Sequence, residues 1–519
     1  MMNRKISRRD AGKALLAGSA GVLVVAARYS SMTDATPTNT PKQELWYRQP
    51  AKEWTEALPV GNGRLGAMVM GGTEQERIQL NEETLWTGGP YDPDTSGGPV
   101  ALPEIRRLVF EGKYLQAHDL FGRKVMGYPT DQMSYQPLGN LWLTFPGHAS
   151  VADYRRTLDM DEAIVRVTYR VGDVQFTREI FSSPVDQVMV LRLTASKPGS
   201  ISLRARISGG KNTDHSGDEY YTSDGVPPDG LVLRGHNSSD QGVKGKLDYQ
   251  ARVKAIAEGG NVATGYQELT VSHANAVTLL ISAATNFANA KDVSGDPEAK
   301  AVRYLADVAG KSYQDIRAAH VAEHQRLFRR VSFDLGTTDA ANQPIDTRLK
   351  NFATTDDPHL VMLFFQYGRY LLISSSRPGT QPANLQGIWN QDMNPWWGSK
   401  YTTNINLQMN YWPAEVANLA DCAEPLMEMV AEIVEPGERT ATLMYGAKGW
   451  VLHQNTDLWL ATAPMDGPTW GTFSVGGAWL CSHLWEHYLF NGDREFLQKI
   501  YPILKGSAHS ARLQTSAGQ

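Results

Sequence analysis

The sequence predicts a multidomain protein of the β-plus-α class, in which a β-sandwich comes first and a helical region follows. Two changes of pattern carry this prediction. From about residue 44 to residue 290, apolar and polar residues alternate with the period of two that is typical of strands. After about residue 355 the apolar residues recur with helical spacing. With 519 residues, 41% of them hydrophobic, the chain is long enough for two or three domains with complete cores.

Residues 1–27 are expected to be an export signal. Arg8 and Arg9 precede the apolar run Ala14–Ala27, which has 14 residues and is shorter than the roughly 20 that a transmembrane helix needs. This order resembles a twin-arginine (Tat) signal, although Ala11 and Gly12 replace the usual Phe and Leu. We therefore expect a periplasmic or secreted protein that has no membrane contact after processing, with residues 28–43 as a polar linker. An uncleaved membrane anchor is the alternative.

Residues 44–290 predict the sandwich domain. Val165–Tyr169, Ile201–Ile207 and Tyr249–Ala255 alternate, whereas Val188–Leu193 and Val277–Ser282 are almost continuously apolar, as buried strands are. Turns rich in Gly, Asp and Asn separate these short runs, as expected for a sandwich. One helical insert is expected at about Pro103–Phe121.

Residues 291–350 predict a helical linker, and residues 351–519 predict a helical domain. Leu360–Ser374 is nearly all apolar and should be a buried helix. Further helices are expected at Glu424–Leu443, Trp479–Phe490 and Glu495–Lys505, after which residues 505–519 lose the helical pattern. Long loops between buried helices are typical of an α/α toroid.

Charge and cysteine content exclude several classes of protein. The net charge of −5 and the isoelectric point near 6.2 imply no polyanionic partner, so we expect no nucleic-acid binding. Two cysteines cannot build a disulfide framework. Cys422 and Cys481 are expected to be small buried thiols, with a single bridge as the alternative. The sequence does not predict an oligomeric state.

The segment 374–415 is rich in Trp, Tyr and Asn and carries almost no net charge. Aromatic faces stack on sugar rings and amides hydrogen-bond hydroxyls in pairs, whereas a phosphate or nucleic-acid site needs a basic run. The segment therefore predicts a pocket for a neutral oligosaccharide or polysaccharide. Candidates for its aromatic lining, about half of which we expect to be core residues, are Trp396, Trp397, Trp412, Trp459, Trp470 and Trp479.

Two motif matches are better explained by structure than by ligand binding. Gly61–Gly66 matches the dinucleotide pattern G-x-G-x-x-G, but Pro59 precedes it and the following apolar run closes at Gly72, so we expect a turn between two strands. His320–His324 matches the zinc pattern H-x-x-E-H, but no third ligand is evident, so we expect solvated histidines on a linker helix. No metal and no cofactor are expected.

Asn404 and Asn406 are the strongest candidates for chemistry. Side chains at i and i+2 lie on the same side only where the backbone is extended. Both amides would then face one cavity, just before a helix that Pro413 starts or kinks. Two amides can orient a water molecule and bind a sugar hydroxyl. The alternative is that both asparagines cap a helix.

Four separated blocks resemble glycoside hydrolase family 95, the inverting 1,2-α-L-fucosidases and their α-L-galactosidase relatives. The likeness runs from about Leu45 to about Lys505 and is carried by Leu58–Gly71, Leu80–Pro90, Tyr135–Leu141 and the segment 374–415. It implies a β-sandwich of the large "super-sandwich" type followed by an (α/α)6 barrel. Such a barrel needs twelve helices, and we count roughly five or six, so we expect an incomplete barrel.

The resemblance implies an exo-acting inverting α-L-fucosidase and assigns roles to individual residues. Asn406 would orient and activate the attacking water as general base, with Asn404 as its helper. An amide is a very poor base, and in the family a remote aspartate polarises it. Substrate-binding positions would be Trp396, Trp397, His453, Asp457 and Trp459. Of these, Asp457 is interpreted as structural or sugar-binding and not as the general acid.

Thr402 departs from many fucosidases of the family, which have His two positions before the first catalytic Asn. That His contacts the sugar near its C5 substituent. Members with Thr are similar to the branch that tolerates α-L-galactosides, so both L-fucose and L-galactose remain open as the terminal sugar.

The family's general acid, a Glu, and its relay Asp would both fall after residue 519, so we expect a truncated sequence. One alternative is therefore a catalytically inactive sugar-binding fragment. Another is a glycoside phosphorylase on a similar plan, which the lack of a basic phosphate-binding loop disfavours.

Overall fold

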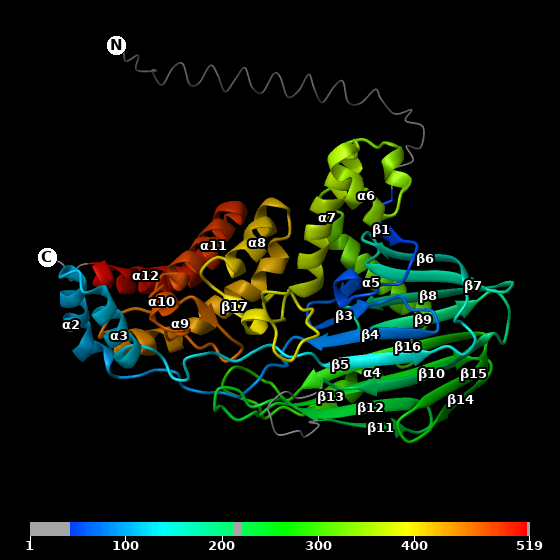
Figure 1. Ribbon diagram of the computed structural model, residues 1–519, viewed down its shortest axis with the longest axis horizontal. Helices are drawn as coiled ribbons and strands as arrows, with labels where there is room; N and C mark the ends of the chain where they lie inside the picture. The colour runs from blue at the N-terminus through cyan, green and yellow to red at the C-terminus, as the bar shows by residue number, and fades with distance from the viewer. Residues whose placement is uncertain (1–41, 211–220, 516–519) are drawn as a thin grey trace, which may run out of the picture. The chain divides into compact units, whose positions relative to one another are not determined.

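Strands fill the first half of the chain and form two antiparallel sheets (Figure 1). The computed structural model describes residues 42–210 and 221–515, and residues Gln43–Gln519 belong to one compact unit. The first sheet has nine strands in the order β1 (Glu44–Tyr47), β6 (Ala152–Asp159), β7 (Ile164–Val171), β8 (Val174–Ser182), β9 (Met189–Ala195), β16 (Ala276–Thr285), β13 (Asp248–Glu258), β12 (Gly230–His236) and β11 (Tyr221–Val226). The second has seven, in the order β14 (Asn261–Thr264), β15 (Leu269–Ala274), β10 (Ile201–Ser208), β5 (Gly139–Thr144), β4 (Gln75–Glu82), β3 (Leu65–Val69) and β2 (Leu58–Gly61).

The two sheets share one apolar core, which the alternating strands supply. In β10, Ile201, Leu203, Ala205 and Ile207 are buried while the residues between them are half-buried or exposed. All ten residues of β16 are buried. One face of β16 belongs to the shared core, and the helix α4 (Pro297–Asp307) packs on the strand as well. The continuously apolar runs are therefore strands with both faces covered, as the sequence predicts.

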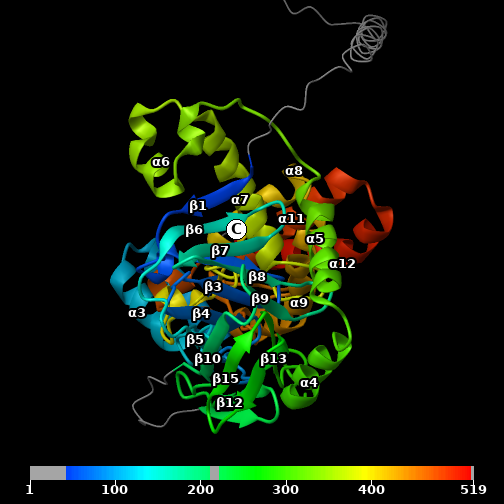
Figure 2. The same ribbon diagram turned by 90° about the vertical axis from the view of Figure 1, so that its right-hand side faces the viewer.

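The predicted linker consists of two long helices, α4 and α5 (Tyr313–Phe328), with the short α6 (Ile345–Asn351) after them. Ser312 and Asp315 form a capping box that fixes the start of α5. Apolar residues of α4 and α5 pack on Phe181, Val190 and Leu280 of the nine-stranded sheet. Figure 2 shows both helices on the same side of the strands.

The histidines of α5 are not solvated, so the sequence prediction for them is wrong. His320 and His324 are 2% and 1% exposed and lie in a column of rings between Phe181 and Phe328. The Nε2–H of His320 donates to the carbonyls of Glu162 and Ala163, at 3.0 and 3.2 Å. That of His324 donates to the Met160 carbonyl at 2.8 Å. Both side chains thus fasten α5 to the turn between β6 and β7.

Helix bounds differ from the prediction in three places. The insert is two helices, α2 (Gly98–Phe110) and α3 (Tyr114–Lys124), because Gly112 with φ +75° breaks the run. Pro103 lies inside α2 and does not start it. The last helix, α12 (Arg494–Thr515), continues well past the predicted end at Lys505.

The helical region consists of α7 (Pro358–Ser375), α8 (Asn406–Val416), α9 (Glu424–Tyr445), the short α10 (Pro468–Gly471), α11 (Gly476–Asn491) and α12. Helix α7 is only partly buried, because Phe364 on its outer face is 80% exposed. Cys422 and Cys481 are buried free thiols, as predicted. None of the helices within residues 42–210 and 221–515 is both long and apolar enough to cross a bilayer.

The hairpin β2–β3 joins the sandwich to the helical region, and its turn is the glycine-rich segment Gly61–Gly66. The predicted turn between strands is confirmed. The N–H of Gly63 donates to the Ser374 carbonyl at 2.9 Å, and a Cβ on Gly61 would lie 2.4 Å from that same oxygen. Only glycine permits this approach of two backbones.

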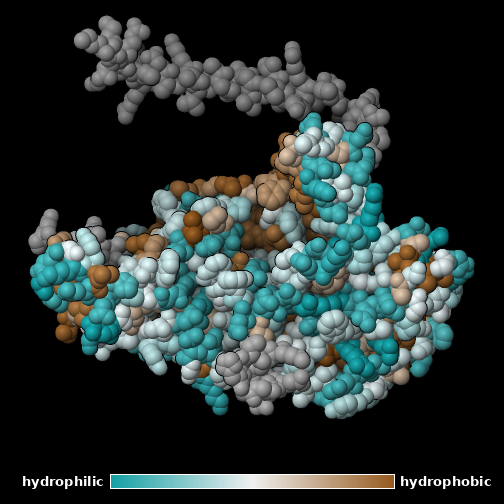
Figure 3. Space-filling view, in the orientation of Figure 1, coloured by the Kyte–Doolittle hydropathy of each residue, from teal (hydrophilic) through white to brown (hydrophobic). Residues whose placement is uncertain are grey.

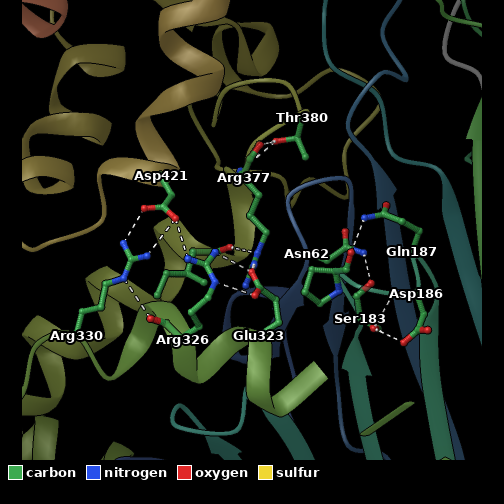
Figure 4. Close-up of polar contacts among 12 residues, drawn as sticks. Asn62, Ser183, Asp186, Gln187, Glu323, Arg326, Arg330, Arg377, Thr380 and Asp421 are labelled. Carbon is green, nitrogen blue, oxygen red and sulfur yellow. Dashed lines mark hydrogen bonds and ion pairs between the residues drawn. The ribbon is translucent and has the colours of Figure 1, made fainter. Parts of the chain in front are cut away.

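Polar contacts extend this joint along α5 (Figure 4). Glu323 accepts from Arg377 at 3.1 Å, and Asp421 accepts from Arg330 at 2.7 Å and from Arg326 at 2.9 Å. The Nδ2–H of Asn62 donates to the Ser183 carbonyl at 2.9 Å. The linker helix, the hairpin and the first loops of the helical region are thereby held together. The predicted signal 1–27 and nearly all of the linker 28–43 lie outside the described residues.

Candidate active site

A two-stranded ribbon positions the residues just before α8. Strand β17 (Tyr401–Thr402) pairs antiparallel with β18 (Asn455–Thr456), so that Thr402 lies opposite Asn455. The N–H of Thr403 then donates to the Gln454 carbonyl at 2.7 Å, and its hydroxyl donates to the His453 carbonyl. These contacts lock residues 401–403 onto residues 453–456.

Asn404 and Asn406 follow this ribbon, but the backbone between them is not extended. Residues 403–405 form a turn, and Asn406 is the first residue of α8. The predicted i, i+2 geometry is therefore wrong at this point, since only Tyr401–Thr402 is a strand. The helix-cap alternative is also wrong, because Ile405 occupies the cap position and no side chain caps the helix. Asn406 is exposed, and Asn404 is half-buried.

Side-chain acceptors without a protein partner gather around this turn. Within the described residues, the buried atoms Asn404 Oδ1 and Thr402 Oγ1 make no hydrogen bond. The same holds for atoms of the neighbouring segments, namely Gln132 Oε1, Gln408 Oε1, Gln454 Oε1, Asn455 Oδ1 and Thr456 Oγ1. Buried polar atoms are normally paired in proteins. Several unpaired atoms near one turn are therefore unusual, and they make this turn the candidate site.

The glutamines of this cluster are fixed through their NH2 groups. The Nε2 of Gln408 donates to the Thr403 carbonyl at 2.7 Å, and that of Gln454 donates to the Met465 carbonyl at 2.8 Å. The Nε2 of Gln132 donates to the Asn455 carbonyl at 3.1 Å. Each amide thus keeps its oxygen as an acceptor in a set orientation. Sequence reasoning missed all three, although Gln408 lies inside the segment 374–415 and Gln454 directly follows His453.

His453 does not have a nitrogen available for a sugar. The side chain is fully buried, its Nδ1–H donates to the Thr462 carbonyl at 2.6 Å, and its Nε2 accepts from the Tyr445 hydroxyl at 2.6 Å. Burial lowers its pKa to about 4, so the ring is neutral at pH 7. The geometry therefore does not support the predicted direct contact between His453 and a sugar. It supports a structural role, in which His453 holds the segment before β18 next to Thr403.

Asp457 is a buried acceptor that ties the sandwich to the helical region. Its carboxylate accepts from the Tyr91 hydroxyl at 2.7 Å and from the N–H groups of Met133 at 3.0 Å and Trp459 at 3.0 Å. Burial raises its pKa, and these donors oppose the rise. Of the two predicted roles, structural or sugar-binding, the geometry supports the structural one.

Trp459 lies away from the two asparagines. Its Nε1–H donates to the Thr87 carbonyl at 3.0 Å, and its ring is 5% exposed. It lines a cavity of about 380 Å³ between α9 and loops of the sandwich, with Tyr91 and Arg439 among its other walls. This cavity shares no residue with the acceptor cluster, so the predicted role of Trp459 at the same sugar site is not supported.

Trp396 and Trp397 lie on the exposed side of the turn that leads into β17. Trp397, Gly398 and Ser399 all have positive φ, at 52°, 63° and 48°. The left-handed conformation costs a residue other than glycine roughly 1–2 kcal/mol. Such strain persists where surrounding contacts impose it, and it clusters at functional sites.

One further carboxylate, on α8, also has a side-chain partner. Glu415 accepts from His487 Nδ1 at 2.6 Å at the opposite end of α8 from Asn406. Asp457 is held by the donors given above. Within the described residues, His, Cys, Asp and Glu do not gather in threes in an arrangement suited to a metal ion.

Comparison with known proteins gives two family matches that follow the division of the chain. Residues 45–290 match the glycosyl hydrolase family 65 N-terminal domain, and residues 312–513 match the glycosyl hydrolase family 95 catalytic domain. Among solved structures, a putative kojibiose phosphorylase from human microbiome is similar with a TM-score of 0.53 at 10% identity, over 90% of this chain and 60% of that one. That likeness concerns the fold alone.

Two curated relatives are named as fucosidases. Alpha-L-fucosidase 2 of Arabidopsis thaliana is 40% identical over 488 residues, which cover 89% of this chain and 58% of the relative. Probable alpha-fucosidase A of Aspergillus niger is 34% identical over 481 residues, which cover 88% of this chain and 58% of the relative. The chain thus spans somewhat more than half the length of these relatives. The catalytic-domain match includes the acceptor cluster around Asn404, and over residues 312–513 the chain is therefore similar to the catalytic domain of glycosyl hydrolase family 95.

Proposed function

We propose that the whole protein is an exo-acting α-L-fucosidase that removes terminal α-L-fucosyl residues from glycans with inversion. The observation that carries this proposal is the cluster of unpaired acceptors around Asn404, at the start of α8. The names of the relatives support the choice of sugar. Sugars carry hydroxyl groups on all sides of the ring, and these hydroxyls can donate hydrogen bonds to the anchored amide oxygens.

In this proposal Asn406 orients the attacking water, because it is the exposed member of the pair and lies at the first turn of α8. Asn404 assists it from a half-buried position. Inversion requires an acid and an activated water on opposite faces of the sugar, with roughly 6.5–9.5 Å between the usual two carboxyl groups. We place the acid and the relay aspartate in the part of the relatives that this chain does not span, since Asp457 and Glu415 are already engaged.

We also propose that the helical region is part of an (α/α)6 barrel. The outer face of α8 carries an apolar stripe at helical spacing, made of Met409, Trp412 and Val416, which are 47%, 48% and 72% exposed. Similar residues are exposed on α7 and α11. Figure 3 shows apolar surface gathered along the upper edge of the helices, where α8 and α11 lie in Figure 1. Further helices would cover this surface.

A second candidate function is that of a sugar-binding fragment without turnover. It is favoured by the hydrogen bonds of Asp457 and Glu415, because a carboxylate held by a structural partner is not free to act as the acid. It concerns the 519-residue chain alone, whereas the fucosidase proposal concerns the protein at the length of its relatives.

The terminal sugar is proposed to be L-fucose or L-galactose. Thr402 is half-buried, and its buried hydroxyl oxygen makes no hydrogen bond to the protein. A hydroxyl on the sugar's C6, which L-galactose has and L-fucose lacks, would find a partner there. Export through the twin-arginine route is likewise a proposal, supported by Arg8, Arg9 and the apolar run after them.

The test is hydrolysis of fucosyllactose by the protein at the length of its relatives, followed by proton NMR of the first product. Inversion of an α-fucosidic bond releases β-L-fucose, which is the expected result. Release of α-L-fucose would contradict inversion. Absence of fucose release by this protein would contradict the fucosidase assignment. Binding of fucosyllactose without release by the 519-residue chain would favour the fragment function for that chain.

A further inference from the structure

A groove lies at one edge of the sandwich, where β5, β10 and the turn between β14 and β15 come close to β11 (Figure 1). Its volume of about 580 Å³ falls in the range of small-molecule sites, roughly 300–1,000 Å³. All of its described lining residues fall between Trp142 and Gln267. The groove therefore belongs to the sandwich and shares no residue with the acceptor cluster around Asn404. We call it the edge groove.

Two aromatic side chains that are open to solvent line the edge groove. Trp142 on β5 is 40% exposed, even though the Arg77 guanidinium lies 5.8 Å from its ring centroid. Tyr266, in the turn that precedes β15, is 80% exposed. Strand β10 lies between β5 and β15, so at about 4.8 Å per strand the two backbones are roughly 10 Å apart across the sheet. An occupant that contacts both rings must therefore be longer than a single sugar.

Contacts with neighbouring residues fix the positions of both aromatic residues. The Nε1–H of Trp142 donates to Ser208 Oγ at 3.1 Å. The Tyr266 carbonyl accepts from the Gly225 N–H at 2.5 Å, and a Cβ on Gly225 would lie 2.0 Å from the Gly265 carbonyl oxygen. Only glycine lets β11 approach the turn so closely. The aromatic surface is therefore in place before a ligand arrives.

The edge groove is also lined by a buried hydroxyl. Ser223 on β11 is 7% exposed, and its Oγ makes no hydrogen bond within the described residues. It lies opposite Leu233 of β12, which belongs to the shared core, and opposite residues of an antiparallel pair point to the same face. The Ser223 side chain therefore points inward from the edge strand. Buried hydroxyls are normally paired, and this one is available to a ligand in the groove.

Charge decides which class of ligand suits the edge groove. Its charged lining residues within the described part of the chain are Arg206 and Asp224, and both have partners. Arg206 pairs with Glu268 at 2.8 Å, and Asp224 pairs with Arg234 at 3.5 Å. The other described side chains are mostly aromatic, hydroxyl or amide groups. An anionic ligand finds no unpaired cation among them, whereas a neutral sugar offers an apolar ring face and hydroxyl groups.

We propose that the edge groove binds a neutral oligosaccharide chain, as a second carbohydrate site outside residues 312–513. Trp142 and Tyr266 stack on two rings of the chain, and Ser223 forms a hydrogen bond with one of its hydroxyls. Such a site holds the protein on an extended glycan, whatever reaction the helical region performs. The inference goes beyond the proposed function and does not depend on it, because the edge groove contributes no residue to the proposed hydrolysis.

The experiment is calorimetric binding to the protein at the length of its relatives. The probes are neutral hexasaccharides of β-1,4-linked glucose, mannose and galactose, the three monosaccharides, and the anionic hexagalacturonate. At least one neutral hexasaccharide should bind more tightly than its monosaccharide, because only the longer ligand reaches both aromatic rings. Failure of all three hexasaccharides to bind, or tighter binding of hexagalacturonate, would overturn the proposal.

Two variants show whether this binding occurs in the edge groove. Tyr266→Ala should weaken hexasaccharide binding about tenfold through loss of a stacked ring, and Ser223→Ala about fivefold through loss of one hydrogen bond. Ser223→Ala should not lower the melting temperature of the free protein, because the hydroxyl has no protein partner within the described residues. Unchanged affinity in both variants would overturn the proposal. A lower melting temperature of Ser223→Ala with unchanged affinity would overturn the binding role of Ser223.

Tyr114→Ala is the matched control, because Tyr114 is a 67% exposed tyrosine at the start of α3, outside the groove. It should leave hexasaccharide affinity unchanged. Fucose release from fucosyllactose is a separate measurement. If Tyr266→Ala lowers hexasaccharide affinity but no fucose is ever released, the edge groove stands and the fucosidase assignment fails. Dimerisation in sedimentation that Tyr266→Ala abolishes, without any sugar binding, would assign the groove to a second copy of the chain and overturn the proposal.

Discussion

Asn404 and Asn406 differ in their surroundings although a single residue separates them. Asn404 is half-buried with its oxygen inside the acceptor cluster, and Asn406 is exposed at the first turn of α8. A side chain that acts on water can be exposed, whereas one that fixes a sugar hydroxyl benefits from burial. The two positions therefore suit the two different functions that we propose for the pair.

Replacing Asn406 by Ala should lower kcat far more than it changes KM. In the proposed mechanism Asn406 acts on the water and not on the bound sugar, so its loss would raise mainly the free energy of the transition state. We expect a fall of about 10²–10⁴-fold in kcat, the range for assistance with proton transfer. Steady-state kinetics on fucosyllactose, with the protein at the length of its relatives, measure this. Asn342→Ala is the matched control, because it removes the same exposed amide at a position outside α8.

Replacing Thr402 by His should shift the preference from α-L-galactosides toward α-L-fucosides. The larger side chain fills the space near C6 of the sugar and displaces the hydroxyl that only L-galactose carries. Pockets reject an extra hydroxyl weakly, by roughly a hundredfold at most, so the shift is modest. The ratio of kcat/KM on the two glycosides is the measurement, and an unchanged ratio would refute the part given to Thr402.

The sequence identified the asparagines but misjudged their neighbours. The pattern Asn-Ile-Asn within an aromatic segment is distinctive, whereas single glutamines such as Gln132 and Gln408 carry no local signal. His453 and Asp457 have the residue types of an active site, yet their partners Tyr445 and Tyr91 come from other elements. Burial and partner choice depend on the tertiary structure, and local pattern does not contain them.

Helix α5 is anchored to the sandwich by buried histidines on one of its faces. His320 and His324 belong to a ring column and bond to carbonyls of the sandwich, so α5 is anchored by neutral imidazoles. Burial lowers the pKa of His320 to about 4 and holds the pKa of His324 well below its usual range. Neighbouring arginines, chiefly Arg377, act in the same direction.

Stability should therefore fall as the pH drops from about 6.5 to about 4. In this window the unfolded chain takes up a proton on His320 that the folded chain refuses, so the free energy of unfolding decreases by up to about 1.4 kcal/mol per pH unit for this group. Denaturant unfolding at several pH values measures the slope. His320→Gln, which keeps a donor for the carbonyls, should flatten it. The exposed His509→Gln should not, and an equal effect of both variants would contradict this account.

Element boundaries show where local pattern fails. The period-two runs of β7, β10 and β13 were predicted because alternation reflects burial on one face. The break between α2 and α3 depends on the φ of Gly112, and the extension of α12 past Lys505 depends on neighbours that local pattern does not reveal. Periodicity therefore predicts the existence of a helix or strand better than it predicts the residue at which the element ends.

The helical region leaves a large apolar surface uncovered in the described part of the chain. Phe364 on α7 and Val416 on α8 are 80% and 72% exposed. Contiguous apolar patches of this kind promote association. The twelve-helix arrangement implied by the resemblance would cover them, but the number of helices in a barrel cannot be read from the pattern of one helix.

Residues 28–519 alone should express poorly, aggregate and show no measurable fucosidase turnover. The uncovered apolar faces cause the aggregation, and lack of general-acid assistance, worth about 10²–10⁴-fold, suppresses turnover. Light scattering and fucose release measure the two effects. Phe364→Ser with Val416→Lys should reduce aggregation of this chain, yet destabilise the protein at the length of its relatives, where the proposed barrel would cover both positions. Full activity of purified 28–519 would instead assign the acid to a carboxylate within the chain.

Export should depend on the arginine pair. Changing Arg8 and Arg9 to Lys should block transport through the twin-arginine route, because the pair is the feature that this route reads. Fractionation of cells producing either version measures the effect, with mature protein expected to begin after about residue 27. Unchanged export would remove the twin-arginine assignment and leave secretion by another route.

The contacts of the hairpin β2–β3 determine when, during synthesis of the chain, the first domain can complete its packing. The Pro59 carbonyl accepts from the Tyr370 hydroxyl, and the Val60 carbonyl from Trp389 Nε1, across 311 and 329 residues of chain. At about 5–20 residues per second, a ribosome needs roughly 15–60 s to deliver these partners. During that interval the nascent sandwich presents an unfinished seam. The hairpin β2–β3, at the start of the first domain, is therefore a surface that ribosome-associated chaperones would need to protect.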